Sequence, residues 1–261
     1  MHPLINIAVS AARAAGRVIM RELPKADQLK VSAKAANDFV SEVDRNAEAV
    51  AVGTIRKAYP EHAILAEESG ASGGGEVRWI IDPLDGTTNF LHGFPQFAVS
   101  IGIEVRGRLE HGVIYNPYNQ ELYVASRGQG ATLDGRRIRV SRRASLDGAL
   151  IGTGFPFRES ENLDRYLEML KAVMEDTAGV RRPGAAALDL AYVAAGRLDG
   201  FWELNLQAWD IAAGIVLIRE AGGRVVDLAD DDADVLASGN IVGGNMKVCA
   251  ALAQRLRPLL N

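Results

Sequence analysis

Apolar residues recur every three or four positions near the start of the chain, which is the spacing of one helical face. This pattern predicts a helix over residues 4–21, and a second helix is predicted over about 43–58. From Phe97 to Val140 the pattern changes to short apolar runs separated by turn signals such as Asn116-Pro117 and Asp134-Gly135. Short runs of this kind predict an antiparallel meander of strands.

After Leu150 the predicted elements alternate between strands and helices. Strands are predicted near 150–153, 201–204, 225 and 241, and helices near 163–175, 185–195, 210–221 and 246–257. We therefore expect an N-terminal α+β domain over 1–144 and a C-terminal α/β domain over 145–261, packed closely together. The Gly- and Ser-rich segment 69–76 is expected to be a flexible loop.

Residues 79–90, with the sequence WIIDPLDGTTNF, carry the densest chemical signal. The apolar run predicts a buried strand that stops at Asp82, because Pro83 cannot continue a central strand. Asp85 follows three residues later, and Gly86 is suited to a positive φ and to a close approach by a ligand. Thr87 would then begin a short helix whose amides face the two carboxylates. Acidic oxygens opposite amide donors suit a hard cation bridged to a phosphate.

Taken alone, this segment is equally well explained as a strand-to-helix turn capped by Asp85. Further acids at similar positions favour the ligand interpretation. Glu67 and Glu68 follow the apolar run 63–66, and Asp210 is placed at the N-cap of the helix predicted over 210–221. A single N-cap aspartate is usually structural, but three acidic sites at the ends of elements indicate one shared centre.

Composition adds only broad limits. With 261 residues, 48% of them hydrophobic, the chain has enough material for a substantial core. The formal charge of −4 argues against a general nucleic-acid-binding surface, although not against a local one. The single cysteine, Cys249, is expected in the core and excludes an internal disulfide. Without a signal peptide or a long apolar segment, a cytoplasmic protein with no membrane association is expected.

Three segments together resemble the inositol monophosphatase family: Glu67-Glu68-Ser69, the run from Asp82 to Phe90, and Trp209 to Gly214 with Glu220 to Gly223. The local strings at 37–44 and 186–197 are most similar to the bacterial SuhB-type branch of that family. The resemblance implies a mixed α/β (α+β) fold, a layered αβαβα sandwich. It also implies a homodimer that lithium inhibits, and a phosphomonoesterase acting on inositol monophosphate and related polyol phosphates.

The resemblance assigns a metal site to these residues. Glu67, Asp82 and the carbonyl of Leu84 would hold one Mg²⁺, and Asp82, Asp85 and Asp210 a second. An all-oxygen ligand set favours Mg²⁺ over Zn²⁺. Two such ions, roughly 4 Å apart, clamp a phosphate and activate a water for attack.

Further residues receive roles in the same way. Thr87 would share the proton network of the attacking water with Glu67 and Asp44, and Asp44 would help a weaker third Mg²⁺. Glu68 is expected behind the ligands, orienting one of them. Lys34 either neutralises the phosphate region or is a surface lysine.

The resemblance implies substrate contacts from Asp85, Gly86, Thr87, Gly184, Ala186, Glu203 and Asp210. For the organic half of the substrate it points to Gly184, Ala186 and Glu203, together with Asp210. Of these, Glu203 is suited to accept paired hydrogen bonds from neighbouring hydroxyls. Two local departures bear on substrate preference: Ala185 stands where relatives often carry Thr or Ser, and Pro183 stiffens the approach to that segment.

Five arginines lie within residues 136–143. Such a run is usually a solvated face, but the SuhB-type branch is associated with transcription complexes and ribosomal RNA synthesis. One alternative is therefore a factor that binds polymerase components or RNA. Another is a relative of the same fold with a different substrate, such as a nucleotide 3′-phosphate, a sugar bisphosphate or histidinol phosphate.

Overall fold

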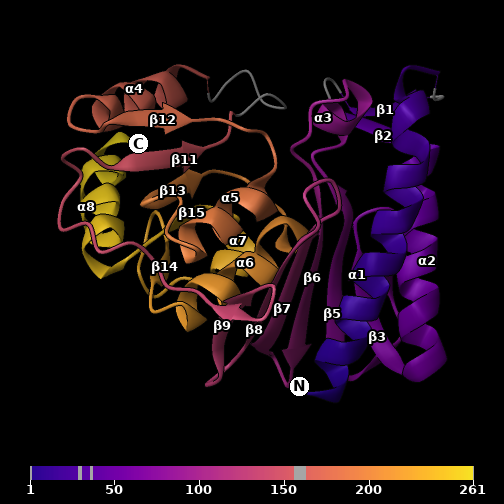
Figure 1. The fold of residues 1–261 in the computed structure, drawn as a ribbon. Helices are drawn as coiled ribbons and strands as arrows, with labels where there is room; N and C mark the ends of the chain where they lie inside the picture. Colours follow the sequence, from indigo (N-terminus) through magenta and orange to yellow (C-terminus); the bar gives the residue numbers. More distant parts are fainter. Residues whose placement is uncertain (1, 29–30, 36–37, 156–162, 261) are drawn as a thin grey trace.

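The structure, a computed structural model, describes residues 2–28, 31–35, 38–155 and 163–260. Its helices and sheets alternate in five layers, seen nearly edge-on in Figure 1. Helices α1 (Pro3–Glu22) and α2 (Glu42–Ala58) cover the outer face of the first sheet, and α5 (Ala186–Ala194) and α6 (Ala208–Glu220) fill the space between the two sheets. On the far side of the second sheet lie α4 (Leu163–Met174) and α8 (Met246–Leu256). This is the layered mixed α/β arrangement that the sequence predicts.

The first sheet has eight strands in the order β10-β9-β8-β7-β6-β5-β3-β4. Its strands are β3 (His62–Ala66), β4 (Gly70–Ser72), β5 (Gly74–Asp85), β6 (Ala98–Val105), β7 (Arg108–Asn116), β8 (Glu121–Ser126), β9 (Gly130–Leu133) and β10 (Arg136–Arg137). From β5 to β10 each strand pairs antiparallel with the next, so the predicted meander is confirmed.

The second sheet has five strands in the order β12-β11-β13-β15-β14. They are β11 (Leu150–Thr153), β12 (Gly179–Arg181), β13 (Gly200–Glu203), β14 (Arg224–Asp227) and β15 (Ile241–Gly244). Smaller elements are β1 (Val31–Ala35) paired with β2 (Asp38–Ser41), the helices α3 (Thr87–Leu91) and α7 (Val235–Ser238), and the 3₁₀ turns η1 (Leu23–Gln28) and η3 (Arg257–Leu259). In the second sheet and among the smaller elements, those that were not predicted are β12, β1, β2, α7, η1 and η3.

Two local expectations were wrong. Within the segment expected to be a loop, Gly70–Ser72 forms β4 and the following residues begin β5, because β3 offers pairing partners on this edge of the sheet. Strand β5 also does not stop at Asp82 but continues to Asp85. Three steps along β5, from Asp82 to Asp85, are matched by two steps along β6, from Ser100 to Ala98.

That mismatch is a β-bulge at the proline. Pro83 has no N–H for the ladder, so the extra residue is accommodated by bending the strand. Side chains of a regular strand alternate between its faces, which would put positions 82 and 85 on opposite sides. The bulge changes this alternation and brings both aspartates into the lining of one cavity.

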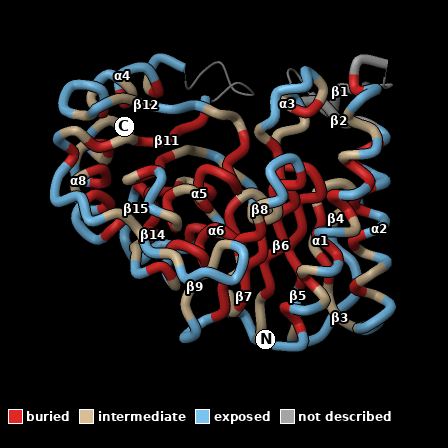
Figure 2. The backbone as a smooth tube through the Cα atoms, in the orientation of Figure 1, coloured by how far each residue is buried: buried red, intermediate tan, exposed pale blue. Residues whose placement is uncertain are grey.

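The buried hydrophobic residues form three clusters: one beneath α1 and α2, one around α5 and α6, and one between the second sheet and α4 and α8. Buried segments, red in Figure 2, occur in every layer. Cys249 is buried on α8, as expected. Although α5 and α6 belong to the second half of the sequence, both pack on the sheet formed by the first half. The two halves therefore share their central layer, and the division at 144/145 stays a prediction. No helix in the described ranges is long and apolar enough to cross a membrane.

Helix α6 packs on the first sheet where glycines leave room for its backbone. A Cβ at Gly102 would lie 2.5 Å from the Cβ of Ala212, and one at Gly112 would lie 2.5 Å from the backbone oxygen of Ala213. Both distances are shorter than a nonbonded contact permits, so the sheet and helix fit only with glycine at these positions. This close contact places the start of α6, and with it Asp210, over the end of β5.

We expect Gly112→Ala to lower the free energy of unfolding by about 1–3 kcal/mol, because a helix backbone must move to admit the methyl group. The matched control is Gly53→Ala on α2, where no atom lies within 4 Å of the added Cβ. That control should gain roughly 0.5–1 kcal/mol from helix propensity. Urea unfolding of both variants decides the matter, and equal stability of the two would contradict the packing account.

Candidate active site

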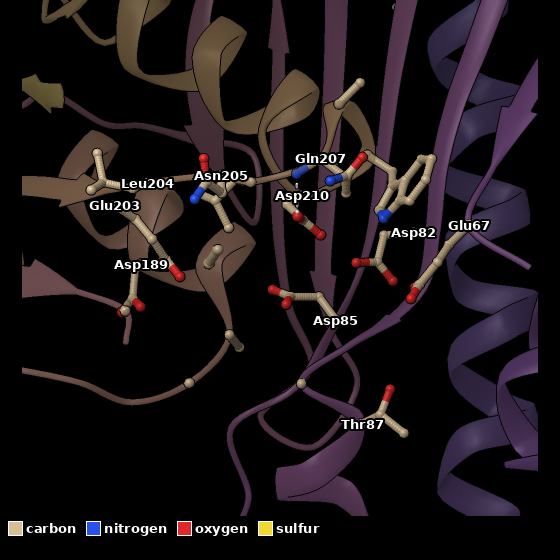
Figure 3. A pocket seen from close by; sticks show the side chains of 18 of the residues that line it. Glu67, Asp82, Asp85, Thr87, Asp189, Glu203, Leu204, Asn205, Gln207 and Asp210 are labelled. Atoms are coloured by element: carbon tan, nitrogen blue, oxygen red, sulfur yellow. Dashed lines mark hydrogen bonds between the residues drawn. The ribbon is translucent and has the colours of Figure 1, made fainter. Parts of the chain in front are cut away.

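A cavity of about 760 Å³ opens between the end of β5 and the first turns of α5 and α6. Ten of the residues predicted from sequence line it: Glu67, Asp82, Leu84, Asp85, Gly86, Thr87, Gly184, Ala186, Glu203 and Asp210. They come from five parts of the chain: the end of β3, β5 and the following turn, the start of α5, β13, and α6. In Figure 3, Glu67 and Asp82 lie on one side, Glu203 on the other, and Asp85 and Asp210 between them.

Asp82 and Asp85 are 2% and 9% exposed. Burial is the first reason that the pKa of both carboxyls is raised well above the ordinary value. Negative neighbours add to it: Glu67, Asp85 and Asp210 act on Asp82, and Asp210 and Glu67 act on Asp85. These acids therefore repel one another, and a bound cation would relieve the repulsion.

Backbone amides hold three of these carboxylates in place. The Leu84 amide donates to Asp82 Oδ1 at 2.9 Å, the Ala187 amide to Asp85 Oδ2 at 2.8 Å, and the Gln207 amide to Asp210 Oδ2 at 2.7 Å. Each hydrogen bond occupies one oxygen of its carboxylate. The bonds orient the acids without providing a full counter-charge.

The bond to Ala187 joins the two halves of the protein. Ala185, at the N-cap of α5, has no hydroxyl and makes no side-chain cap. Asp85 supplies the missing acceptor from β5, across 102 positions in sequence. The helix dipole also favours a negative charge at this end of α5.

Asp210 was expected at the N-cap of α6, and this prediction was wrong. The N-cap residue is Gln207, and Asp210 occupies the third position of the helix. The physical reason is the backward bond from the Gln207 amide to the Asp210 carboxylate, which closes the first turn three residues earlier. The side chain still lines the cavity.

Thr87 connects the turn after β5 to α2. Its hydroxyl lies 2.8 Å from Asp44 Oδ1 and 3.1 Å from the Leu84 carbonyl. One hydroxyl has a single proton, and the shorter distance favours donation to Asp44. Asp44 is 1% exposed and not a solvated helix-start acid. The predicted pairing of Thr87 with Asp44 is thus present.

Gly86 follows Asp85 with φ of 89°, the left-handed conformation that the sequence predicts for it. A Cβ here would lie 2.8 Å from the Gln96 carbonyl. The turn therefore depends on glycine twice, for its conformation and for space. It ends β5 and begins α3 directly beside the acids.

The opposite wall of the cavity contains Glu203 at the end of β13, together with Gly184 and Ala186 before and in α5. A Cβ at Gly154 would overlap the Glu203 carboxylate, so glycine is needed for that acid to stand where it does. Gly154 was not predicted from sequence. Asp189, a buried acid of α5 that lines the same wall, was not predicted either, because an acid in a helical first turn gives no sign of a ligand role.

Two predicted residues, Asp44 and Glu68, are not among the described residues that line the cavity. Asp44 is reached through Thr87, and Glu68 was expected behind the ligands. Its amide and that of Ser69 donate to the two oxygens of Glu48, at 2.8 and 2.9 Å, so the buried Glu48 on α2 fixes the chain just after Glu67. Glu48 could not be predicted as a site residue, because in the sequence it looks like any polar residue on the exposed face of a helix. Lys34 belongs to β1, and its side chain lies outside what the structure describes.

The donor set fits a hard divalent cation. It consists of carboxylates and the Leu84 carbonyl, and two of the acids are buried beside others of like charge. Among the described residues, no three His, Cys, Asp or Glu side chains form a finished metal site as they stand.

Comparisons with known proteins give one consistent result. The model of the inositol monophosphatase family matches residues 1–259. A protein of Pseudomonas aeruginosa named Nus factor SuhB is 54% identical, over 100% of this chain and 98% of its own. The crystal structure of extragenic suppressor protein suhB from Bartonella henselae is 48% identical with a TM-score of 0.95, covering 98% of this chain and 99% of that one. The inositol monophosphatase from Anabaena (Nostoc) sp. PCC 7120 is 39% identical with a TM-score of 0.83, covering 98% and 95%.

The raised carboxyl pKa values make the metal-free protein sensitive to pH. A carboxyl whose pKa is higher in the folded state contributes stability that is complete below the unfolded value of about 4 and is lost as the pH rises through the folded value. We therefore expect Asp82→Asn to stabilise the protein in EDTA at pH 8, by on the order of 1 kcal/mol or more.

This gain should shrink steadily toward pH 4, because protonated aspartate and asparagine then carry the same charge. Urea unfolding across this pH range measures it. Asp147→Asn, at an exposed position, is the control and should show no such trend. A variant at position 82 that is less stable than the wild type at pH 8 would disprove the repulsion.

Proposed function

The chain belongs to the inositol monophosphatase family, and from this premise we propose that it is a Mg²⁺-dependent phosphomonoesterase that releases phosphate from inositol monophosphate and related polyol phosphates. The observation that carries the proposal is the convergence of Glu67, Asp82, Asp85 and Asp210 on one cavity. Buried acids that repel one another are retained where a cation or a reaction needs them.

In this proposal Glu67, Asp82, Asp85, Asp210 and the Leu84 carbonyl hold two or three Mg²⁺. When bound, these ions would neutralise the phosphate and the departing alkoxide and favour attack by water. The protein's own contribution is positioning, since phosphoryl transfer requires alignment and charge neutralisation more than a covalent intermediate.

Proton handling falls to the pair of Thr87 and Asp44. Because the Thr87 hydroxyl donates to Asp44, the lone pairs of its oxygen are left to accept a hydrogen bond from water and so to orient it. Glu67, on the adjacent strand end, is the proposed general base for that water. The amides of Gly86 and Thr87, at the start of α3, would contact the phosphate.

Glu203 is proposed to bind hydroxyls of the organic half, with Gly184 and Ala186 shaping the space around it. Asp210 lies between Glu203 and the other acids in Figure 3, in a position to contact both halves of the substrate. A cytoplasmic location, a homodimer and inhibition by lithium remain proposals supported by the family resemblance.

Asp85→Asn should reduce phosphate release by at least about a hundredfold, because the amide keeps the bond from Ala187 but loses the charge that holds the cation. Phosphate release is measured over a panel containing inositol 1-phosphate, a nucleotide 3′-phosphate, fructose 1,6-bisphosphate and histidinol phosphate, with Mg²⁺ titrated. Asp147→Asn serves as the control. Equal turnover by wild type in EDTA and in Mg²⁺ would refute the metal-dependent function, and a preference for another panel member would reassign the substrate.

The name Nus factor SuhB, carried by the relative from Pseudomonas aeruginosa, supports a second candidate function: association with the transcription apparatus or RNA. The arginines at positions 136, 137, 139, 142 and 143 are all exposed on or just after the β9–β10 hairpin. Among the described contacts of these arginines, Arg143 pairs with Asp199 at 3.3 Å, whereas Arg139 donates to a backbone carbonyl. A local positive surface on a chain of net negative charge suits an RNA or an acidic partner.

Reversing the charge of Arg139 and Arg142 together to glutamate should weaken RNA or polymerase association about tenfold or more in low salt, while phosphate release stays unchanged. The matched control reverses Arg13 and Arg17, two exposed arginines of α1. Binding is followed by fluorescence anisotropy with labelled RNA and by co-purification with polymerase. Retained association in the first variant would eliminate this surface.

A further inference from the structure

Asp189 is the one buried acid on the Glu203 side of the cavity that the proposed function leaves without a role. It lies in the first turn of α5 and is 1% exposed. Within the described part of the structure, its Oδ1 atom is buried and has no hydrogen-bond partner. The residue nevertheless lines the cavity, beside Glu203 in Figure 3 and away from Glu67 and Asp82.

A structural role in α5 does not account for this burial. The amide of the first turn that needs an acceptor, Ala187, is bonded to Asp85 and not to Asp189. An acid that only stabilised the N-terminus of the helix through its charge could do so at the surface, where the carboxylate stays hydrated. A buried polar oxygen left without a hydrogen bond is unfavourable, so its presence in a cavity wall points to a ligand group that satisfies it.

We propose that Asp189 is a specificity-determining residue that, together with Glu203, forms hydrogen bonds to neighbouring hydroxyls of the substrate's organic half. The inference rests on the proposed phosphatase function and adds to it a residue that selects the hydroxyl-bearing part of the ester. The phosphate is held at the opposite side of the cavity, so Asp189 affects which ester binds and not the attack on phosphorus.

The chemistry of the two acids suits a diol. Burial raises the pKa of Asp189 well above the ordinary carboxyl value, and the charges of Glu203 and Asp85 raise it further, whereas Arg182 opposes the shift. Carboxyl oxygens accept hydrogen bonds, and a carboxyl that keeps its proton also donates one. Two adjacent hydroxyls, one accepting and one donating, complement such a pair.

The neighbouring residues also favour a neutral polyol over a second phosphate. Arg182 lies over the Phe155 ring, 4.8 Å from its centroid, and both residues line the cavity. Among the described residues of the lining, Arg182 is the only cation, and Asp189 and Glu203 are two acids of the same wall. A second phosphate at this end would be repelled by the two acids, whereas a ring that bears hydroxyls would form hydrogen bonds with them.

The test compares wild type, Asp189→Leu and Asp189→Asn on two esters, inositol 1-phosphate and 4-nitrophenyl phosphate, which has no hydroxyls. Asp189→Leu should raise KM for inositol 1-phosphate about tenfold, with kcat within about twofold. The KM for 4-nitrophenyl phosphate should stay within about twofold. Asp189→Asn keeps a donor and an acceptor of the same shape and should restore most of the affinity.

Binding of free inositol gives a readout independent of turnover. In the presence of Mg²⁺, inositol should raise the unfolding temperature of wild type and Asp189→Asn, and raise that of Asp189→Leu much less. If wild type released phosphate from neither ester, the proposed function would fail, and this comparison would still decide the role of Asp189.

Three results would overturn the inference. Equal losses on both esters would mean that Asp189 only maintains the shape of the cavity. Unchanged KM and inositol binding in Asp189→Leu would mean that the side chain is only packed there. A wild-type preference for the ammonium-bearing histidinol phosphate, lost in Asp189→Asn, would mean that the acid binds a cation instead of a hydroxyl.

Discussion

The burial of Asp82 and Asp85 among other acids is the constraint on which the rest of the structure depends. Two carboxylates of one strand are enclosed where the first sheet meets α5 and α6, and their neighbours raise the free energy of ionising them. Such an arrangement opposes folding unless something else holds it together. The surrounding structure supplies that support through backbone amides and close helix packing, and a divalent cation would supply the missing charge.

This constraint explains why the two halves of the chain share a central layer. Asp85 accepts its hydrogen bond from α5, and the glycines of β6 and β7 let α6 approach closely enough to bring Asp210 to the end of β5. Neither half contains the complete set of acids. The site therefore forms only when α5 and α6 pack on the first sheet. A change that weakens this packing would also disturb the geometry of the site.

Much of this was predictable from sequence, because strong periodicity reports local structure well. The helices of the outer layers, the meander, the positive φ of Gly86 and ten of the lining residues followed from patterns or from family resemblance. Most of what failed depends on residues that are distant in sequence. The bulge at Pro83 needs the register of β6, and the buried states of Asp44, Glu48 and Asp189 are set by elements far away in the chain. The N-cap of α6 failed for a local reason, because glutamine is not a typical capping residue.

The central claim is that these acids converge to hold divalent ions, and the most direct measurement locates such ions. Crystals of the protein grown with Mn²⁺ as a Mg²⁺ substitute, measured at the manganese edge, give the position of each ion from its anomalous signal. The account predicts strong peaks among Glu67, Asp82, Asp85 and Asp210, with Asp82 ligating more than one ion. Fully occupied manganese elsewhere, with these four side chains still apart and unliganded, would contradict it.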